Sequence, residues 1–270
     1  MTQQEFCRIV HHMLDYYGID LSHKKVIIEG RLENYISSRG YKNFDEYMNV
    51  VEADPKGSEA QNIVDILTTN HTYFFREKEH YDFLKQVILP QLKKQEEETK
   101  NIRIWSAAAS TGEEPYTIAM VIKDFLAFEY PNWDTTILAT DISKEVLTKA
   151  IIGVYPERQL GELPKKWIQA NFTKINEEEY EVKEALKQKV IFRQFNLMDS
   201  LPFHNKLHVI FLRNVMIYFN EETRQQLIKR IVEFLEPGGY LIIGMTEHID
   251  KEMYDLEYVG ASIYRKKDRK

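Results

Sequence analysis

IRIWSAAASTGEEPYTIAM, at residues 102–120, carries the strongest indication of architecture in the chain. Its apolar first half is typical of a buried strand, and its second half places apolar residues at the three- and four-residue steps of a helix. Between the two halves, Gly112 permits a tight turn and Pro115 suits the first position of a helix. We therefore predict a strand that passes through a tight turn into a helix, the repeating unit of an α/β domain.

The segments that follow alternate between strand-like and helix-like patterns. Residues 135–141 (TTILATD) predict a strand, and residues 143–152 (SKEVLTKAII) predict a helix. This alternation is typical of parallel strands joined by crossover helices, so we predict a doubly wound α/β sheet. A helix at 221–235 is expected to end before Pro237-Gly238-Gly239. Further strands, the last of them a single closing strand, are expected at 189–197, 208–214, 238–245 and 257–267.

Upstream of the sheet, residues 1–70 predict helices alone. Apolar residues recur at helical spacing in the segments 7–18, 24–40 and 44–54. Residues 91–101 are polar and predict a connector or helix end. The stretch between Ile152 and Lys189 is too long for a simple loop, so an inserted helix with a small antiparallel subdomain is expected at about 153–189. The resulting prediction is an all-α N-terminal domain (1–75) and an α/β domain (76–270).

Composition excludes several classes of protein. With 43% hydrophobic residues in 270, the chain is able to bury a full core. The single cysteine, Cys7, cannot form an internal disulfide, and the chain opens without an apolar signal region, so we expect a cytoplasmic protein. No run approaches the roughly 18 apolar residues of a membrane span, and no membrane insertion is expected. A net charge of −6 makes a nucleic-acid partner unfavourable.

The turn at 109–114 is the first candidate for ligand binding. Ligands of open α/β sheets bind outside the carboxyl ends of the strands, where this turn lies. The dinucleotide fingerprint GxGxxG is missing, and Glu113 and Glu114 stand where a pyrophosphate needs backbone donors. A cationic ligand fits better than NAD, FAD or ATP. Alternatively, such an acid only stabilises the first turn of the helix, and we expect this of one of the two.

Two other segments carry candidate ligand contacts. Asp141 ends the second predicted strand, where a carboxylate is able to accept both hydroxyl groups of a ribose. Alternatively, Asp141 or Ser143 caps the following helix. In NHTYFFREKEHYDFL (70–84), Arg76 is able to clamp a carboxylate in bidentate fashion. The alternative there is a helix start with an aromatic core stripe and a solvated arginine.

Read together, five segments resemble the chemotaxis receptor methyltransferases, the CheR family. These segments are TNHTYFFR (69–76), WSAAASTGEEPYTIAM (105–120), LATDIS (138–143), FNLMDSLPF (195–203) and FLRNVMIYF (211–219). The resemblance spans nearly the whole chain. It implies a Rossmann-like domain that binds S-adenosylmethionine (AdoMet), with an inserted β-subdomain and a helical N-terminal domain. It also implies methylation of glutamates on the cytoplasmic helical bundle of methyl-accepting chemotaxis receptors, with S-adenosylhomocysteine (AdoHcy) as the product.

The resemblance further implies the residues of the site. Asp141 takes the ribose, and Asn196 and Leu197 frame the adenine. The other implied AdoMet contacts are Asn70, Thr72, Arg76, Glu113, Arg213 and Asn214. Tyr218 lies beside the transferring methyl group, and Arg76 and Tyr218 position the reactants without moving protons. No metal is expected.

Three expectations about partners and alternatives complete the prediction. The inserted segment FTKINEEEYEVKEALK has no glycine, unlike members that dock a receptor's C-terminal pentapeptide, so pentapeptide docking is not expected. Segment 24–42 carries five basic and two acidic residues, either as a solvated helix face or as a docking surface for an acidic receptor helix. The rival functions are an AdoMet-binding sensor or adaptor without turnover, and a methyltransferase acting on another substrate such as a nucleobase.

Overall fold

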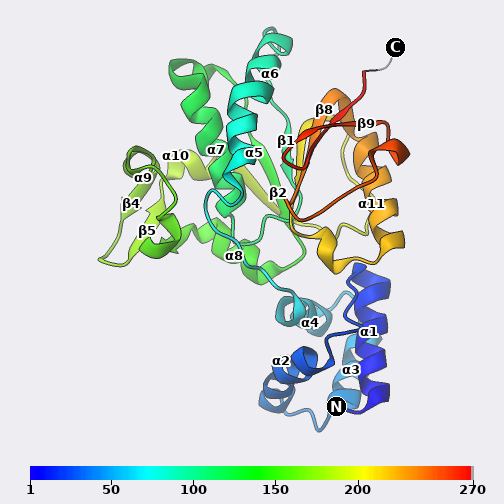
Figure 1. Cartoon of the computed structure of the whole chain (residues 1–270). Coiled ribbons are helices and arrows are strands. Elements are labelled where there is room, and N and C mark those ends of the chain that lie inside the picture. Colours follow the sequence, from blue (N-terminus) through cyan, green and yellow to red (C-terminus); the bar gives the residue numbers. More distant parts are fainter. Residues whose placement is uncertain (269–270) are drawn as a thin grey trace.

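The computed structural model describes residues 1–268, so the last two residues of the predicted α/β domain lie outside the described part (Figure 1). The N-terminal part consists of helices α1 (Gln3–Tyr17), α2 (Lys25–Ser38), α3 (Phe44–Ala53) and α4 (Ser58–Leu67). Thr2 and Glu5 form a capping box at the start of α1, and Gly18 ends that helix with a φ of 69°. The all-α prediction is confirmed, although the sequence patterns singled out no separate segment for α4.

A seven-stranded sheet forms the centre of the α/β part, in the order β6-β2-β1-β7-β8-β10-β9. Strands β6, β2, β1, β7 and β8 are parallel, whereas β10 pairs antiparallel with β8 and β9. The chain winds outward from β1 to β2 and β6, then returns to β7 on the other side of β1. The carboxyl ends of β1 and β7 therefore flank the topological switch point, where such sheets bind ligands. The strands are β1 (Ile104–Ser106), β2 (Ile137–Asp141), β6 (Val190–Gln194), β7 (Leu207–Leu212), β8 (Leu235–Ile243), β9 (Leu256–Gly260) and β10 (Ile263–Lys266).

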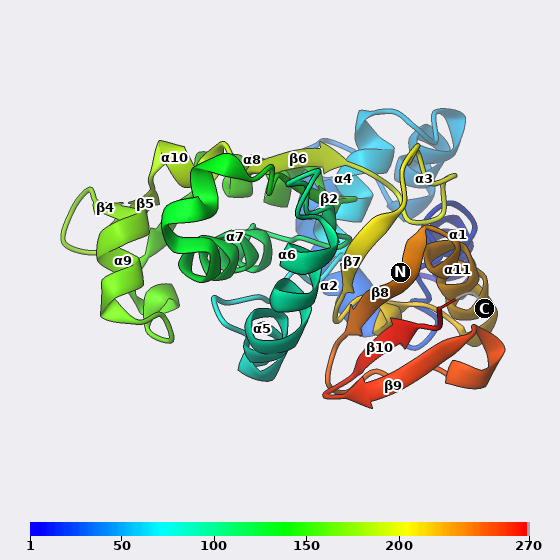
Figure 2. The same cartoon turned by 90° about the horizontal axis from the view of Figure 1, so that it is seen from above.

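Helices cover both faces of this sheet, as the view from above shows (Figure 2). Along β7, Val209 and Phe211 join one hydrophobic cluster, while Ile210 and Leu212 join the other. This alternation is the two-residue period of a strand that is buried on both faces. The first cluster packs against the helices around α7, and the second packs against α11 and the N-terminal helices. The helices are α5 (Lys78–Phe83), the π-helix η1 (Leu84–Ile88), α6 (Leu89–Gln95), α7 (Glu113–Leu126), α8 (Lys144–Ile152) and α11 (Glu221–Glu233), with 3₁₀ turns η2 (Ala127–Asn132), η4 (Met216–Tyr218) and η5 (Lys251–Met253).

The insertion folds as a small three-stranded antiparallel sheet with two short helices, which confirms the predicted subdomain. The strand order is β3-β5-β4, and the subdomain projects from the side of the main sheet (Figure 1). Its elements are β3 (Val154–Pro156), η3 (Glu157–Leu160), α9 (Lys165–Asn171), β4 (Phe172–Lys174), β5 (Glu179–Val182) and α10 (Glu184–Lys187).

Three local predictions were wrong. Helix α11 ends at Glu233, and Pro237-Gly238-Gly239 lies inside β8, where a register shift against β7 accommodates it. The closing segment is a hairpin of β9 and β10 instead of one strand, because Ala261 and Ser262 both adopt the positive φ of a tight hairpin turn. Pro115 is the third residue of α7, which begins at Glu113. Among the described residues, no helix is long and apolar enough to cross a membrane.

Candidate active site

A cavity of about 1000 Å³, including its open mouth, lies outside the carboxyl ends of β1, β2, β6 and β7. The strap between α4 and α5, residues 68–77, runs across it, and residues of the loop between α1 and α2 form another part of its wall. All of the predicted site residues except Glu113 line this cavity. They are Asn70, Thr72, Arg76, Asp141, Asn196, Leu197, Arg213, Asn214 and Tyr218.

Asp141 is buried at the end of β2, and both of its carboxylate oxygens are already oriented. Oδ2 accepts the backbone N–H of Ser110 (2.8 Å), and Oδ1 accepts that of Ser143 (3.0 Å). The Ser143 hydroxyl caps α8 by accepting the N–H of Val146, so the cap is not filled by Asp141. Burial raises the pKa of Asp141, and the backbone donors oppose that effect. Each oxygen keeps a lone pair for one further donor, which is what a ribose diol requires.

The turn after β1 depends on Gly112, which has a φ of 96°. A Cβ there would lie 2.9 Å from the Ala150 Cβ and from the Tyr155 hydroxyl, so only glycine fits. Glu113 is buried behind the turn, where its carboxylate accepts the Thr111 hydroxyl (2.7 Å) and burial raises its pKa. Glu113 is therefore not a wall residue of the cavity. Its neighbour Glu114 is one.

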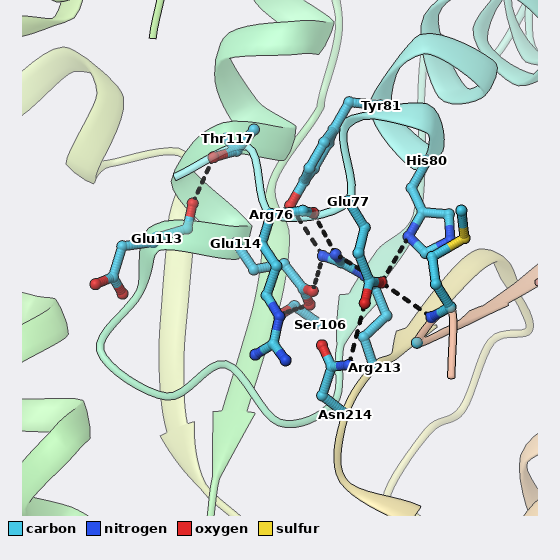
Figure 3. Close-up of polar contacts among 12 residues, drawn as sticks. Arg76, Glu77, His80, Tyr81, Ser106, Glu113, Glu114, Thr117, Arg213 and Asn214 are labelled. Atoms are coloured by element: carbon cyan, nitrogen blue, oxygen red, sulfur yellow. Dashed lines mark hydrogen bonds and ion pairs between the residues drawn. The ribbon is translucent and has the colours of Figure 1, made fainter. Parts of the chain in front are cut away.

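Glu114 belongs to a buried ionic cluster around Arg213 (Figure 3). The Arg213 guanidinium donates to Glu114 (2.6 Å), to the Tyr81 hydroxyl (3.0 Å) and to Glu77 (3.2 Å). It also donates to the backbone carbonyl of Arg76. Burial by itself lowers the pKa of Arg213, but Tyr81, Glu114 and Glu77 raise it overall, so the guanidinium stays charged. The cluster joins the strap to β7 and to the first turn of α7.

Glu77 and His80 extend this cluster. Burial acts to raise the pKa of Glu77, but Arg213 and the side-chain amide of Asn214 lower it, so Glu77 is an anion. Burial and the Arg213 charge lower the pKa of His80 to about 4, which makes its imidazole neutral at pH 7. Neither Glu77 nor Tyr81 was predicted from the sequence. The available signal was their place in the segment 70–84, because the residues that join them to β7, Arg213 and Asn214, are more than 130 residues away.

Arg76 belongs to the strap, and Tyr218 is bonded to it from the turn after β7. Arg76 donates to the His71 carbonyl (2.8 Å), and no carboxylate among residues 1–268 forms an ion pair with it. The Tyr218 hydroxyl donates to the carbonyl of Thr69 (3.0 Å), and burial raises its pKa. The Lys24 ammonium lies 5.2 Å from the centre of the Tyr218 ring. The charges of Arg76 and Arg31 lower the pKa of Tyr218, whereas that of Glu247 raises it.

The N-terminal helices hold two walls of the cavity. The side-chain amide of Asn196 donates to the Tyr16 carbonyl (2.7 Å), and the N–H of Asp20 donates to the carbonyl of Tyr218 (2.8 Å). An isolated bridge pairs Ile19 with Phe219 next to it. Because these bonds join α1 and its loop to the ends of β6 and β7, the helical part takes part in shaping the site. No group of three or more metal-ligating side chains occurs within the described chain.

These features fit AdoMet. The free lone pairs of Asp141 are able to accept a diol, Phe195 and Leu197 offer an apolar wall, and the Arg76 guanidinium is able to donate to a carboxylate. The fold and this cavity define an AdoMet-dependent methyltransferase. The sequence profile of the CheR methyltransferase SAM-binding domain matches residues 70–265, and that of the CheR all-alpha domain matches residues 4–68. The chain belongs to the CheR methyltransferase family.

Full-length relatives agree with this assignment. The chemotaxis protein methyltransferase of Borreliella burgdorferi is 42% identical over 98% of this chain and 95% of its own length. Chemotaxis protein methyltransferase 2 of Pseudomonas aeruginosa is 36% identical over 97% of this chain and 93% of its own. The chemotaxis protein methyltransferase of Escherichia coli is 34% identical over 98% and 91%, respectively.

Proposed function

We propose that this protein transfers a methyl group from AdoMet to glutamate side chains on the cytoplasmic helical bundle of chemotaxis receptors. The names of the relatives support a role in chemotaxis. The observation that carries the choice of a carboxylate substrate is the positive charge near Tyr218, where Arg76 lines the cavity and the Lys24 ammonium lies 5.2 Å from the centre of the Tyr218 ring. An anionic side chain is attracted to such a mouth. In this proposal the enzyme works in the cytoplasm and does not tether the receptor's C-terminal pentapeptide.

The chemistry needs little from the protein beyond placement. The cofactor supplies an electrophilic methyl group on a sulfonium, and a glutamate with an ordinary pKa near 4.3 is already a nucleophilic anion at pH 7. No general base is needed. We propose that Arg76 and Tyr218 orient the reactants and exclude water, an effect that in oriented reactions lowers the barrier by roughly 7–11 kcal/mol.

The proposed cofactor contacts follow the walls of the cavity. Asp141 accepts the ribose hydroxyls, while Asn196 and Leu197 frame the adenine. Asn70, Thr72 and Arg76 reach the ligand from the strap, and Arg213 and Asn214 close the pocket from the end of β7. Glu113 stays a prediction, and its buried position suggests that it supports the turn through Thr111.

We also propose that the two parts of the chain have different functions. Residues 1–75 dock the receptor, and residues 76–270 carry out catalysis, with the insertion at about 153–189. Within the basic segment 24–42, Lys24 and Lys25 are the candidate docking cations. Arg31 has a different task, because its guanidinium donates to the carbonyls of Ile66, Leu67 and Thr68 (3.1–3.2 Å) at the end of α4.

Mass spectrometry of receptor peptides tests this function. After incubation with AdoMet and receptor-containing membranes, methyl groups are expected on glutamate side chains only. The variant Tyr218→Phe removes the hydroxyl bonded to Thr69 and is expected to lower turnover about tenfold, the value of one hydrogen bond in the transition state, while AdoHcy still binds. Tyr258→Phe, at a half-exposed tyrosine of β9, is the matched control. Methylation of other residue types refutes the substrate, and full turnover of Tyr218→Phe refutes the role of Tyr218.

A further inference from the structure

Glu247 is a buried carboxylate that does not line the cavity. It lies in the loop after β8, with 7% of its surface exposed. Its oxygens accept three backbone N–H groups, those of Gly244 (2.7 Å), Met216 (2.8 Å) and Asn214 (2.9 Å). Within residues 1–268, no lysine or arginine forms an ion pair with it. Its whole bonding capacity is directed at main-chain amides of two neighbouring loops.

Two of these amides belong to the turn that carries Tyr218. Residues 214–218 follow β7, and Asn214 has a φ of 57°, a left-handed conformation that is uncommon outside glycine. In this irregular turn the amides of Asn214 and Met216 have no strand partner, so Glu247 supplies the acceptors that the sheet does not. An unpaired buried N–H is costly, and the turn depends on this side chain for its shape.

A second carboxylate, that of Glu77, also contacts this turn. Glu77 accepts the side-chain N–H of Asn214 (3.2 Å) and the backbone N–H of Met245 (3.2 Å), as Figure 3 shows for Asn214. Gly244 leaves the space in which the Asn214 side chain meets Glu247. A Cβ at that position would lie 2.4 Å from the Asn214 amide nitrogen and 2.9 Å from a Glu247 oxygen. The loop after β8 is thus shaped to hold the turn after β7.

We infer that Glu247 is a positioning residue for methyl transfer, which fixes the turn 214–218 and acts through Tyr218. The inference rests on the proposed function, in which Tyr218 lies beside the reacting groups. Glu247 moves no proton and touches no substrate. Arg213, just before this turn, is anchored by Glu77, Glu114 and Tyr81, and the Asn214 side-chain amide is held by Glu77, so the cofactor end of the cavity keeps these anchors without Glu247.

The variant Glu247→Gln tests this inference. Its amide group would place an N–H against a backbone N–H, which breaks at least one of the three bonds. We expect kcat for receptor methylation to fall about tenfold, while the dissociation constant of AdoHcy stays within about threefold of the wild type. Glu252→Gln, at an exposed glutamate of the same loop, is the matched control and is expected to behave as wild type.

A second variant reaches the same contact without removing the carboxylate. Gly244→Ala pushes a methyl group between Asn214 and Glu247 and is expected to give the same loss of kcat. Gly161→Ala is its control, since the nearest atom to the added Cβ is 3.7 Å away. Gly244→Ala therefore reports on the turn even if Glu247→Gln folds poorly.

Combining Glu247→Gln with Tyr218→Phe separates positioning from general structural support. If Glu247 acts through Tyr218, then Glu247→Gln slows the wild-type background about tenfold but the Tyr218→Phe background by less than about twofold. Full turnover of both Glu247→Gln and Gly244→Ala overturns the inference. The inference is also overturned if Glu247→Gln lowers kcat by the same factor in both backgrounds. This includes the case in which Tyr218→Phe is itself fully active. A wild-type protein that methylates no receptor is a failure of the proposed function instead, and that result is obtained before any variant is measured.

Discussion

Replacing Asp141 by asparagine tests the cofactor site at its best-defined residue. Each oxygen of Asp141 already accepts one backbone N–H, from Ser110 and Ser143, and offers one remaining lone pair to the ribose. In Asp141→Asn, one oxygen becomes an NH₂ group that faces a backbone donor and can no longer accept a hydroxyl. Hydrogen bonds to charged groups contribute about 1.5–3 kcal/mol each, so we expect a loss of about 2–3 kcal/mol in binding.

That loss corresponds to AdoHcy binding that is weaker by roughly 30- to 150-fold. Isothermal titration calorimetry with AdoHcy measures it directly, at a temperature well below the melting point of the variant. Asp134→Asn is the matched control, because Asp134 lies exposed just before the opposite end of the same strand. An Asp141→Asn dissociation constant within about threefold of the wild-type value would refute the assignment of Asp141 to the ribose.

Four further outcomes follow from the structure. Glu114→Gln should destabilise the protein by about 3 kcal/mol, which is the low end for breaking a buried ion pair because Glu77 still faces Arg213. The melting temperature should then fall by roughly 6 °C. An unchanged melting curve contradicts the ionic cluster. Arg31→Ala should lower the free energy of unfolding by about 1 kcal/mol through lost carbonyl bonds at α4 and leave methylation intact at denaturant concentrations below the transition. Selective loss of methylation would instead indicate that Arg31 contacts the receptor. Charge reversal at both Lys24 and Lys25 should slow receptor methylation without weakening AdoHcy binding, and equal methylation rates would place docking elsewhere. Burial raises the pKa of Asp141 above its ordinary 3.8, so between the two pKa values the folded protein holds a proton that the unfolded chain has released, and this group's contribution to stability should decline as pH rises through that window. AdoHcy affinity should decline as pH falls through the raised pKa of Asp141. An affinity that does not change with pH in acid, or the same acid dependence in Asp141→Asn, would argue against a ribose contact at Asp141.

Local sequence patterns predicted much of the fold. The strand-turn-helix at 102–120 and the alternation after it correspond to β1, α7, β2 and α8, because strand and helix periods are local properties of the sequence. The end of α11 was missed because Pro237 is usually excluded from strand interiors. The register shift between β7 and β8 that admits it arises only when both strands are present. The final hairpin was missed because its turn uses Ala261 and Ser262 instead of glycine or asparagine.

The candidate site was predicted through resemblance more than through pattern. Spacing alone left Asp141 open between a ribose contact and a helix cap, and the structure assigns the cap to Ser143. The ionic cluster of Glu77, Glu114 and Arg213 was not predictable, since its members lie far apart in the sequence and meet only where the strap crosses β7. The same reason hid Glu247, whose partners are backbone amides that carry no residue-specific signal.

The chemical identity of the product tests the central claim most directly. The protein is incubated with AdoMet that carries a labelled methyl group and with receptor-containing membranes, and the labelled receptor is then treated with mild alkali. Glutamyl methyl esters hydrolyse under these conditions, so we predict that the label is released as volatile methanol. Label that stays on the product after alkali would indicate methylation of another group, such as a base nitrogen, and no incorporation at all would indicate a sensor without turnover. Either result would contradict a glutamate methyltransferase.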